Sequence, residues 1–341
     1  LRSAQAVPIR YKPASRCVIR YDLALQHTDG QQRTLSIFGK VYANPVQART
    51  VQALLQRLYT EQSTHQGSTV ARYTQRTPLL PRPLLYVDQH GLTMNEAVQP
   101  FTSQGTLRTG TKVLQPQVIQ QRGGKIVSPE TPSAELRLAA IALARLHTSL
   151  VDPGQATLRP GAKEAKRAHE RAALLSSYYP AQATKIQELV LTLAQRLEVL
   201  QPDTYRPAHG GFKASQLLYR DDAVSVVDFD GFCLADPALD VGYFLAYLRP
   251  SGLWYQRQGM RAWFESAANT FTTTYAEAMG ELGVSPTEIA GILHRAQLYT
   301  AALLFKIATR RVNRLNSPRA AELTSILTEI TVCLAQNIKG E

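Results

Sequence analysis

The stretch "HGGFKASQLLYRDDAVSVVDFDGFCLADPALD" (209–240) decides the fold of this chain. It begins with a polar, glycine-containing loop, continues as two short apolar segments around the polar turn "RDDA" (220–223), and ends in a second loop rich in aspartate. Two apolar segments joined by such a turn predict a hairpin over 217–229. Asp228 closes the second segment beside a loop, where a carboxylate oxygen suits a hard ion such as Mg²⁺. The stretch therefore predicts a polar loop followed by an acidic hairpin.

The residues around this stretch have helical periodicity. "SAELRLAAIALARLHTSL" (133–150) places leucines and alanines on one face of a helix. The same spacing predicts further helices over 161–177, 181–200, 257–281, 286–314 and 318–337. The apolar runs in these helices are shorter than the roughly 20 residues that a membrane span needs, so the sequence predicts no transmembrane helix.

The first hundred residues have the alternation of strands instead. "CVIRYDLAL" (17–25) and "RTLSIFGKVYA" (33–43) flank an Asp29-Gly30 turn signal, which predicts an antiparallel hairpin. An amphipathic helix over 45–61 follows, and then two strands over 83–87 and 92–98. We expect an α+β protein with two domains. The first, 1–98, is a β-rich lobe with one helix, and the second, 99–341, is a mostly helical lobe.

A small β lobe followed by a large helical lobe is the bilobal architecture of protein kinases, and the 209–240 stretch narrows the resemblance. It resembles the aminoglycoside phosphotransferase and choline kinase family, whose pattern is HGDxxxxN, then a strand ending in Asp, then GDPxxDLA. The matching residues are His209, Gly210, Gly211, Gln216, Asp228, Asp236, Pro237 and Asp240. "LARLH" (143–147) and "GKVY" (39–42) also resemble segments of that family. The resemblance implies ATP-dependent phosphoryl transfer to a small-molecule hydroxyl, with Mg²⁺ as cofactor.

The resemblance also implies roles for individual residues. Phosphoryl transfer needs a lysine on the phosphates, metal held by carboxylate and amide oxygens, and an Asp that orients the acceptor hydroxyl. We expect Lys40 on the nucleotide phosphates and Asp228 and Gln216 as metal ligands. Lys213 is the candidate to neutralise the transferred phosphoryl group. His147, His209, Asp236 and Asp240 are expected to brace the structure rather than to react.

Gly211 is the main departure, because it stands where the family has its catalytic Asp. A glycine cannot orient or deprotonate a hydroxyl, and the loss of a general base typically costs about 100-fold to 10,000-fold in rate. Asp230 is the candidate substitute carboxylate, although it can equally stabilise the turn before Gly231.

The first lobe departs from the family as well. "YKPASR" (11–16) lacks the glycines that let backbone amides cradle phosphate. Lys12 and Arg16 can replace them with side-chain charge. The helix 45–60 offers no acid to pair with Lys40, only Glu61 at its end. Phe38 can either stack on the nucleotide base or block it.

Composition indicates the kind of partner and the compartment, and two functional hypotheses remain. The net charge of +12 predicts an acidic partner, and without zinc-finger spacing or an aromatic-rich basic run the sequence does not favour nucleic acid. Three widely spaced cysteines argue against a disulfide framework and favour the cytoplasm. One hypothesis is a phosphotransferase with reduced or altered activity. The alternative is a pseudokinase that binds a nucleotide, a metabolite or a protein partner without turnover.

Overall fold

The computed structural model describes residues 1–26, 30–64, 80–96, 107–121, 124–128, 130–154, 156–220, 223–249, 257–312 and 320–338. The chain divides into two compact units, each built from segments that are distant in the sequence. The first unit comprises Leu1–Arg108, Leu150–Gln155 and Leu217–Asp230. The second comprises Thr109–Ser149, Ala156–Gln216 and Gly231–Glu341.

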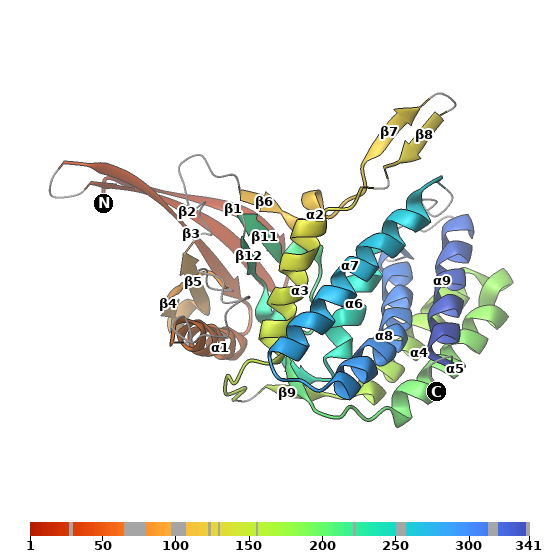
Figure 1. The fold of residues 1–341 in the computed structure, drawn as a ribbon. Coiled ribbons are helices and arrows are strands. Elements are labelled where there is room, and N and C mark those ends of the chain that lie inside the picture. Colours follow the sequence, from red (N-terminus) through yellow and green to blue (C-terminus); the bar gives the residue numbers. More distant parts are fainter. Residues whose placement is uncertain are drawn as a thin grey trace. The chain divides into compact units, whose positions relative to one another are not determined.

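A five-stranded antiparallel sheet with the order β1-β2-β3-β5-β4 forms most of the first unit (Figure 1). Its strands are β1 (Ser3–Lys12), β2 (Arg16–Gln26), β3 (Gln32–Tyr42), β4 (Pro83–Val87) and β5 (Leu92–Glu96). The predicted hairpin is confirmed as β2 and β3, which pair from Arg16↔Tyr42 to Gln26↔Gln32. Residues 27–29 of the predicted turn lie outside the described residues. The two later strands are confirmed as β4 and β5.

β1 was not predicted. The strand "SAQAVPIRYK" has nearly all of its side chains exposed, so it has no buried face to generate an alternating pattern. Pro8 and the register shift between Pro8 and Arg10 interrupt its pairing with β2. Both features are common on edge strands, where an unpaired edge must be protected from other chains.

One helix covers part of the sheet. The predicted helix is confirmed as α1 (Pro45–Thr64), which begins after Asn44 with a proline at its first turn. Its buried side chains pack toward β4 and β5 and are Ala48, Val51, Leu54, Leu55 and Leu58. The predicted 217–229 hairpin is confirmed as β11 (Leu217–Arg220) and β12 (Ala223–Val226), with β6 (Leu107–Thr109) beside β11. Residues 221–222 of its turn lie outside the described residues.

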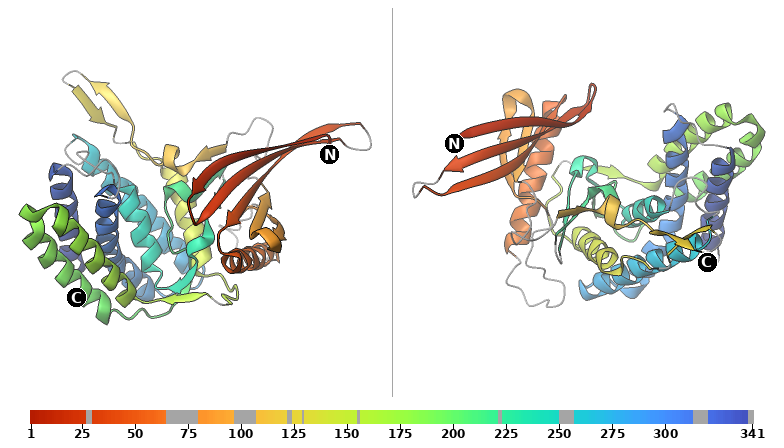
Figure 2. Two further views of the ribbon diagram at one scale, coloured as in Figure 1. Left: turned by 180° about the vertical axis from the view of Figure 1, so that it is seen from behind. Right: turned by 90° about the horizontal axis from the view of Figure 1, so that it is seen from above.

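The second unit is helical. Its helices are α2 (Gly110–Val113), α3 (Ser133–His147), α4 (Gly161–Tyr178), α5 (Ala183–Val199), α6 (Ala238–Leu248), α7 (Met260–Glu281), α8 (Pro286–Val312) and α9 (Ala320–Ile338). The predicted helices are confirmed as α3, α4, α5, α7, α8 and α9. α6 packs on α8, and α3 packs on α7 (Figure 2). The core between them is aromatic: the Phe244 and Phe271 rings stack with centroids 4.0 Å apart, beside the fully buried Phe212.

Short strands complete this unit. β7 (Val118–Gln121) and β8 (Gly124–Val127) form a hairpin that projects from the helices (Figures 1 and 2). β13 (Cys233–Ala235) lies between β10 (Arg206–Ala208) and β9 (Thr157–Arg159). β10 leads directly into the 209–216 loop, and Arg159 of β9 donates to the Gly210 carbonyl of that loop.

These elements confirm the α+β class, with an antiparallel-sheet first region and a helical second region. In the described part of the chain, every helix is too short or too polar to span a lipid bilayer.

Candidate active site

A cluster of charged side chains surrounds Lys40 in the first unit. Lys40 lies on β3, and the period-2 alternation of a strand places it on the same face as Tyr42. Its ammonium Nζ donates to Asp228 Oδ1 at 2.7 Å and to Asp230 Oδ1 at 2.5 Å. The Tyr42 hydroxyl donates to the same Asp230 oxygen at 2.8 Å. The lysine of β3 therefore takes its acidic partners from the segment after β12, and not from α1.

Arg16, the first residue of β2, closes the cluster from the other side. Its guanidinium donates to Asp230 Oδ2, and a second nitrogen lies 3.5 Å from Asp228 Oδ2. Two cations and two carboxylates thus balance each other in a partly buried position, where only 16% of the Lys40 side chain and 11% of the Asp230 side chain are exposed. Partial burial weakens the screening of these charges by water, so each charge strongly affects the others.

Tyr42 belongs to this cluster and was not predicted. Burial raises the pKa of its phenol far above the ordinary value, and the negative charge of Asp230 raises it further. Tyr42 therefore remains a neutral hydrogen-bond donor to Asp230. The signal that could have revealed it is its position two residues after Lys40 on the same strand face.

The backbone of Asp228 helps to aim its carboxylate. Asp228 has a φ of 71°, in the left-handed region that non-glycine residues rarely adopt. Asp and Asn tolerate this region better than most residues, because their short polar side chains can bond locally. A non-glycine residue in this conformation at the end of an apolar strand is typical of a functional site, where surrounding contacts hold the strained geometry.

The chemistry of the cluster fits a divalent cation. Oxygens of Asp228 and Asp230 converge on one ammonium group, so two hard carboxylate ligands already face the same point. Within the described ranges, no group of three or more His, Cys, Asp or Glu residues could hold a metal ion. Mg²⁺ commonly binds through one or two carboxylates and completes its shell with water and phosphate, so two carboxylates suffice. Lys40 and Arg16 pair with these carboxylates in the structure.

The 209–216 loop lies in the second unit and is held by its backbone. Gly210 has a φ of 71°, and a Cβ at this position would lie 1.9 Å from the Gly231 carbonyl oxygen, so only glycine fits. Asp240 on α6 accepts hydrogen bonds from the amides of Gly210 and Phe212, each at 3.2 Å. Arg159 donates to the Gly210 carbonyl at 2.8 Å. The loop is therefore fixed from two sides.

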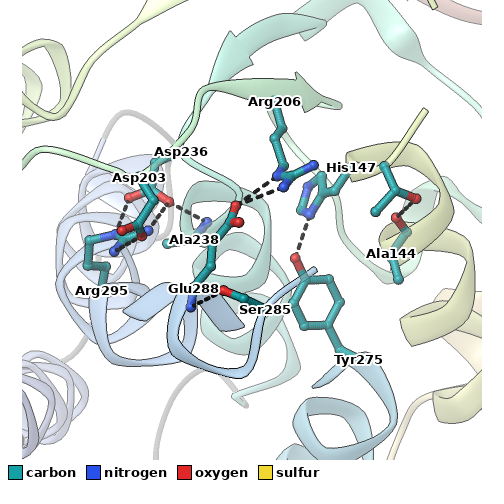
Figure 3. A network of polar contacts seen from close by, with 11 residues as sticks. Ala144, His147, Asp203, Arg206, Asp236, Ala238, Tyr275, Ser285, Glu288 and Arg295 are labelled. Carbon is teal, nitrogen blue, oxygen red and sulfur yellow. Dashed lines mark hydrogen bonds and ion pairs between the residues drawn. The ribbon is translucent and has the colours of Figure 1, made fainter. Parts of the chain in front are cut away.

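Two buried histidines, His147 and His209, lie near this loop. His147, the last residue of α3, pairs its Nδ1 with the Tyr275 hydroxyl at 2.7 Å (Figure 3). Its Nε2 lies 3.6 Å from an Asp240 carboxylate oxygen. Burial raises the pKa of Asp240, but the interactions with His147 and the loop amides outweigh it and hold this pKa below its usual value. His209 is buried with its ring against Phe212.

Asp236 anchors the start of α6 in the same network. Its carboxylate accepts from the Ala238 amide at 3.0 Å and from Arg295 Nε at 2.8 Å, and Arg206 pairs with Glu288 nearby (Figure 3). Asp236 and Asp240 thus hold the helix start and the loop, as expected from the resemblance.

The backbone conformation at position 211 does not require a glycine. Its φ lies outside the left-handed region, and a Cβ there would meet only Gln216 Nε2 and His209 Nδ1, each at 4.0 Å. Position 211 therefore has room for a Cβ atom. The buried Gln216 closes the short turn Ala214–Gln216, and its amide Oε1 accepts no hydrogen bond from the described residues. Lys213 lies over the Tyr247 ring, 5.7 Å from its centroid.

The other residues that the sequence singled out lie outside the cluster around Lys40. Lys12 ends β1 with an exposed side chain, and the Phe38 side chain on β3 is also exposed. Glu61 accepts from the Leu150 amide at 2.6 Å. The first unit thus brings Lys40, Arg16, Asp228 and Asp230 together, whereas Lys213 and Gln216 belong to the second unit.

An antiparallel sheet with its lysine and carboxylates, followed by a helical region with an Asp-braced loop, defines the kinase-like phosphotransferase class. A model of the phosphotransferase enzyme family matches residues 84–277, more than half of the chain. The chain belongs to this family.

Solved structures agree on the fold. A glucosamine kinase in complex with glucosamine, ADP and inorganic phosphate is 14% identical, with a TM-score of 0.55 over 96% of this chain and 83% of that chain. A spectinomycin phosphotransferase in complex with ADP and spectinomycin is 12% identical, with a TM-score of 0.52 over 98% and 92%. A choline/ethanolamine kinase family protein from Mesorhizobium loti is 11% identical, with a TM-score of 0.52 over 98% and 91%. No curated protein matches the sequence. At these identities the likeness shows the fold alone.

Proposed function

We propose that this protein transfers a phosphoryl group from ATP to the hydroxyl group of a small molecule, at a rate reduced by Gly211. The observation that supports this most strongly is the convergence of Asp228 and Asp230 on the Lys40 ammonium. A lysine beside paired carboxylates is what a metal-bound triphosphate needs. The relatives crystallised with ADP support the use of a nucleotide.

Each residue of the cluster has a proposed role. Asp228 would hold Mg²⁺, and the ion would neutralise charge on the phosphates. Lys40 and Arg16, once released from the carboxylates, are free to pair with phosphate oxygens, and Lys12 adds charge at the end of β1. The exposed Phe38 ring offers a surface on which a nucleotide base can stack.

The proposed transfer lacks its usual base. Lys213 neutralises charge on the transferred group. Asp230 is the proposed substitute for the carboxylate that is absent at position 211. Asp230 already binds Lys40, Arg16 and Tyr42, so these contacts restrain it from acting as a base. Slow transfer follows, because a positioned base contributes about 100-fold to 10,000-fold to such reactions.

A pseudokinase is the second candidate, and Arg16 is the observation that favours it. Its contacts with both carboxylates give a cluster that is already neutral without a metal ion. A protein of this kind would bind nucleotide, a metabolite or a protein partner without turnover.

In either case the three cysteines are free thiols, which supports a reducing compartment such as the cytoplasm.

The Asp228→Asn variant tests the metal role. Asn tolerates positive φ as Asp does, so we expect the variant to melt at nearly the wild-type temperature. In the wild-type protein with Mg²⁺, ATP at about 100 times its dissociation constant should stabilise by about 2.7 kcal/mol, and the same ATP concentration should stabilise less with EDTA. In the variant, the difference between Mg²⁺ and EDTA should vanish. Thermal unfolding with ATP measures both quantities.

Asp22→Asn is the matched control, because Asp22 is a carboxylate of the same sheet that pairs with Arg20 instead. It should keep the full Mg²⁺ response. A large loss of stability in Asp228→Asn with an unchanged Mg²⁺ response would show that Asp228 is only a structural residue.

A further inference from the structure

An asparagine on the strand next to Lys40 shares its face of the sheet but takes no part in the charged cluster. Asn95 on β5 pairs with Phe38 on β3, and Thr93, two residues before it, pairs with Lys40. Residues directly opposite in an antiparallel pair lie on one face of a sheet, as do residues two apart on a strand. The pair of Phe38 and Asn95 therefore lies on the Lys40 face, about 7 Å farther along the strands.

The side-chain carbonyl of Asn95 lacks a hydrogen-bond donor. Its Oδ1 is buried, and no described residue donates to it. Among the described residues of the five-stranded sheet, it is the only enclosed side-chain nitrogen or oxygen without a partner. On the same face, Ser36 donates to Asp22 at 2.7 Å, and the Thr93 hydroxyl donates to the Lys40 carbonyl at 3.4 Å. A buried acceptor without a donor costs stability, so its presence in a folded protein needs an explanation.

The position of this acceptor indicates which donor it would meet. With phosphates at Lys40 and a base stacked on Phe38, as proposed above, Asn95 lies at the base end of the nucleotide. Adenine carries an amino group at position 6, which is a hydrogen-bond donor, whereas guanine carries a carbonyl acceptor there. An acceptor beside the base therefore suits adenine.

The orientation of the Asn95 amide favours the same donor. Its Nδ2 carries two N–H groups, so turning the nitrogen inward would enclose unpaired donors in place of one unpaired acceptor. The inward carbonyl is thus the less costly arrangement without a ligand, and it is the one that an amino group can use. Across the strand pair, the Phe38 side chain is 37% exposed, so its ring has room to turn when a base enters.

We propose that Asn95 is a specificity residue that accepts a hydrogen bond from the 6-amino group of adenine, so that the protein prefers ATP to nucleotides of 6-oxo purines. This role rests on the proposed phosphotransferase function and names the base that it uses. A 6-oxo purine would bring a second acceptor against Asn95 Oδ1 and would leave both oxygens without a donor. Replacement of Asn95 changes the preference among bases and leaves the contacts of Lys40 with phosphate in place.

Three triphosphates that differ at position 6 of the purine test this role. ATP carries an amino group there, purine riboside triphosphate carries hydrogen, and inosine triphosphate carries a carbonyl oxygen. In calorimetric titrations of the wild-type protein with Mg²⁺, we expect ATP to bind at least about fivefold more tightly than purine riboside triphosphate, because it pairs an acceptor that otherwise lacks a donor. Inosine triphosphate should bind no more tightly than purine riboside triphosphate.

Asn95→Leu removes the acceptor at similar size, so the three triphosphates should then bind within about twofold of one another. Without nucleotide the variant should melt no lower than the wild type, because it loses an unpaired buried group. A residue with a merely structural role would lower the melting temperature when replaced. Asn269→Leu is the matched control, at an exposed asparagine of α7, and it should keep the wild-type preference for ATP.

Two results would overturn the role of Asn95. One is a wild-type protein that binds either of the other triphosphates as tightly as ATP, a comparison that needs no variant. The other is a preference for ATP that survives in Asn95→Leu. Equal binding of all three triphosphates would contradict the role of Asn95 alone, whereas failure of all three to bind would contradict the proposed phosphotransferase together with it.

Discussion

The Gly211→Asp variant should turn over ATP faster than the wild-type protein, by up to about 100-fold to 10,000-fold. An Asp at this position would supply the carboxylate that orients and deprotonates an acceptor hydroxyl. The structure leaves room for it, because a Cβ at Gly211 meets its nearest neighbours only at 4.0 Å. One of these neighbours, the Gln216 amide Nε2, can donate a hydrogen bond to the new carboxylate. We therefore expect the variant to fold as the wild type does.

Release of ADP, measured with and without candidate hydroxyl acceptors, gives the rate, and thermal unfolding gives the stability. Gly211→Asn is the control, since it has the same size and hydrogen-bonding reach but cannot act as a base. Only the Asp variant should gain activity. A well-folded Asp variant that binds Mg-ATP and gains no turnover would place the defect beyond this residue. That outcome favours the pseudokinase.

Replacement of Asp240 should have the largest effect on stability. Its fully buried carboxylate accepts from the amides of Gly210 and Phe212 and lies beside His147. Removal of one partner from a buried charged network typically costs about 3–5 kcal/mol. We expect Asp240→Ala to lower the free energy of unfolding by about this amount in urea titrations. Asp203→Ala, at an exposed carboxylate paired with Arg295, should cost about 1 kcal/mol or less.

The difference between wild type and Asp240→Ala should depend on pH. Because the folded protein holds the pKa of Asp240 below its usual value, the stability from this group is fully present above the unfolded pKa of about 3.9. It is lost as the pH falls through the folded pKa. The two proteins should therefore differ most near pH 6 and converge in acid. A gap that stays constant below pH 4 would contradict this role for the carboxylate.

Much of the fold could be predicted from the sequence, because buried faces leave regular patterns. β2 and β3 alternate around a turn signal, and α1 repeats its leucines at helical spacing. β1 left no such pattern, since both of its faces are exposed. Strands of three residues, such as β9 and β10, are too short to establish a period.

The site could be predicted in part for a similar reason. Lys40 and Asp228 close or interrupt apolar strands, so their polarity stands out locally. The contact between Arg16 and Asp230 joins residues 214 positions apart, and it depends on tertiary packing that local patterns do not encode. The left-handed glycine of the loop is Gly210 and not Gly211, a distinction that the sequence pattern alone does not make.

Calorimetric titration of ATP into the wild-type protein, with Mg²⁺ and with EDTA, tests the proposed function most directly. We expect binding in both conditions, because Lys40 and Arg16 can pair with phosphate without a metal ion. Mg²⁺ should strengthen it by about tenfold or more, as expected when a charged contact to Asp228 is added. Absence of binding at millimolar ATP with Mg²⁺ would contradict both the phosphotransferase and the nucleotide-binding pseudokinase.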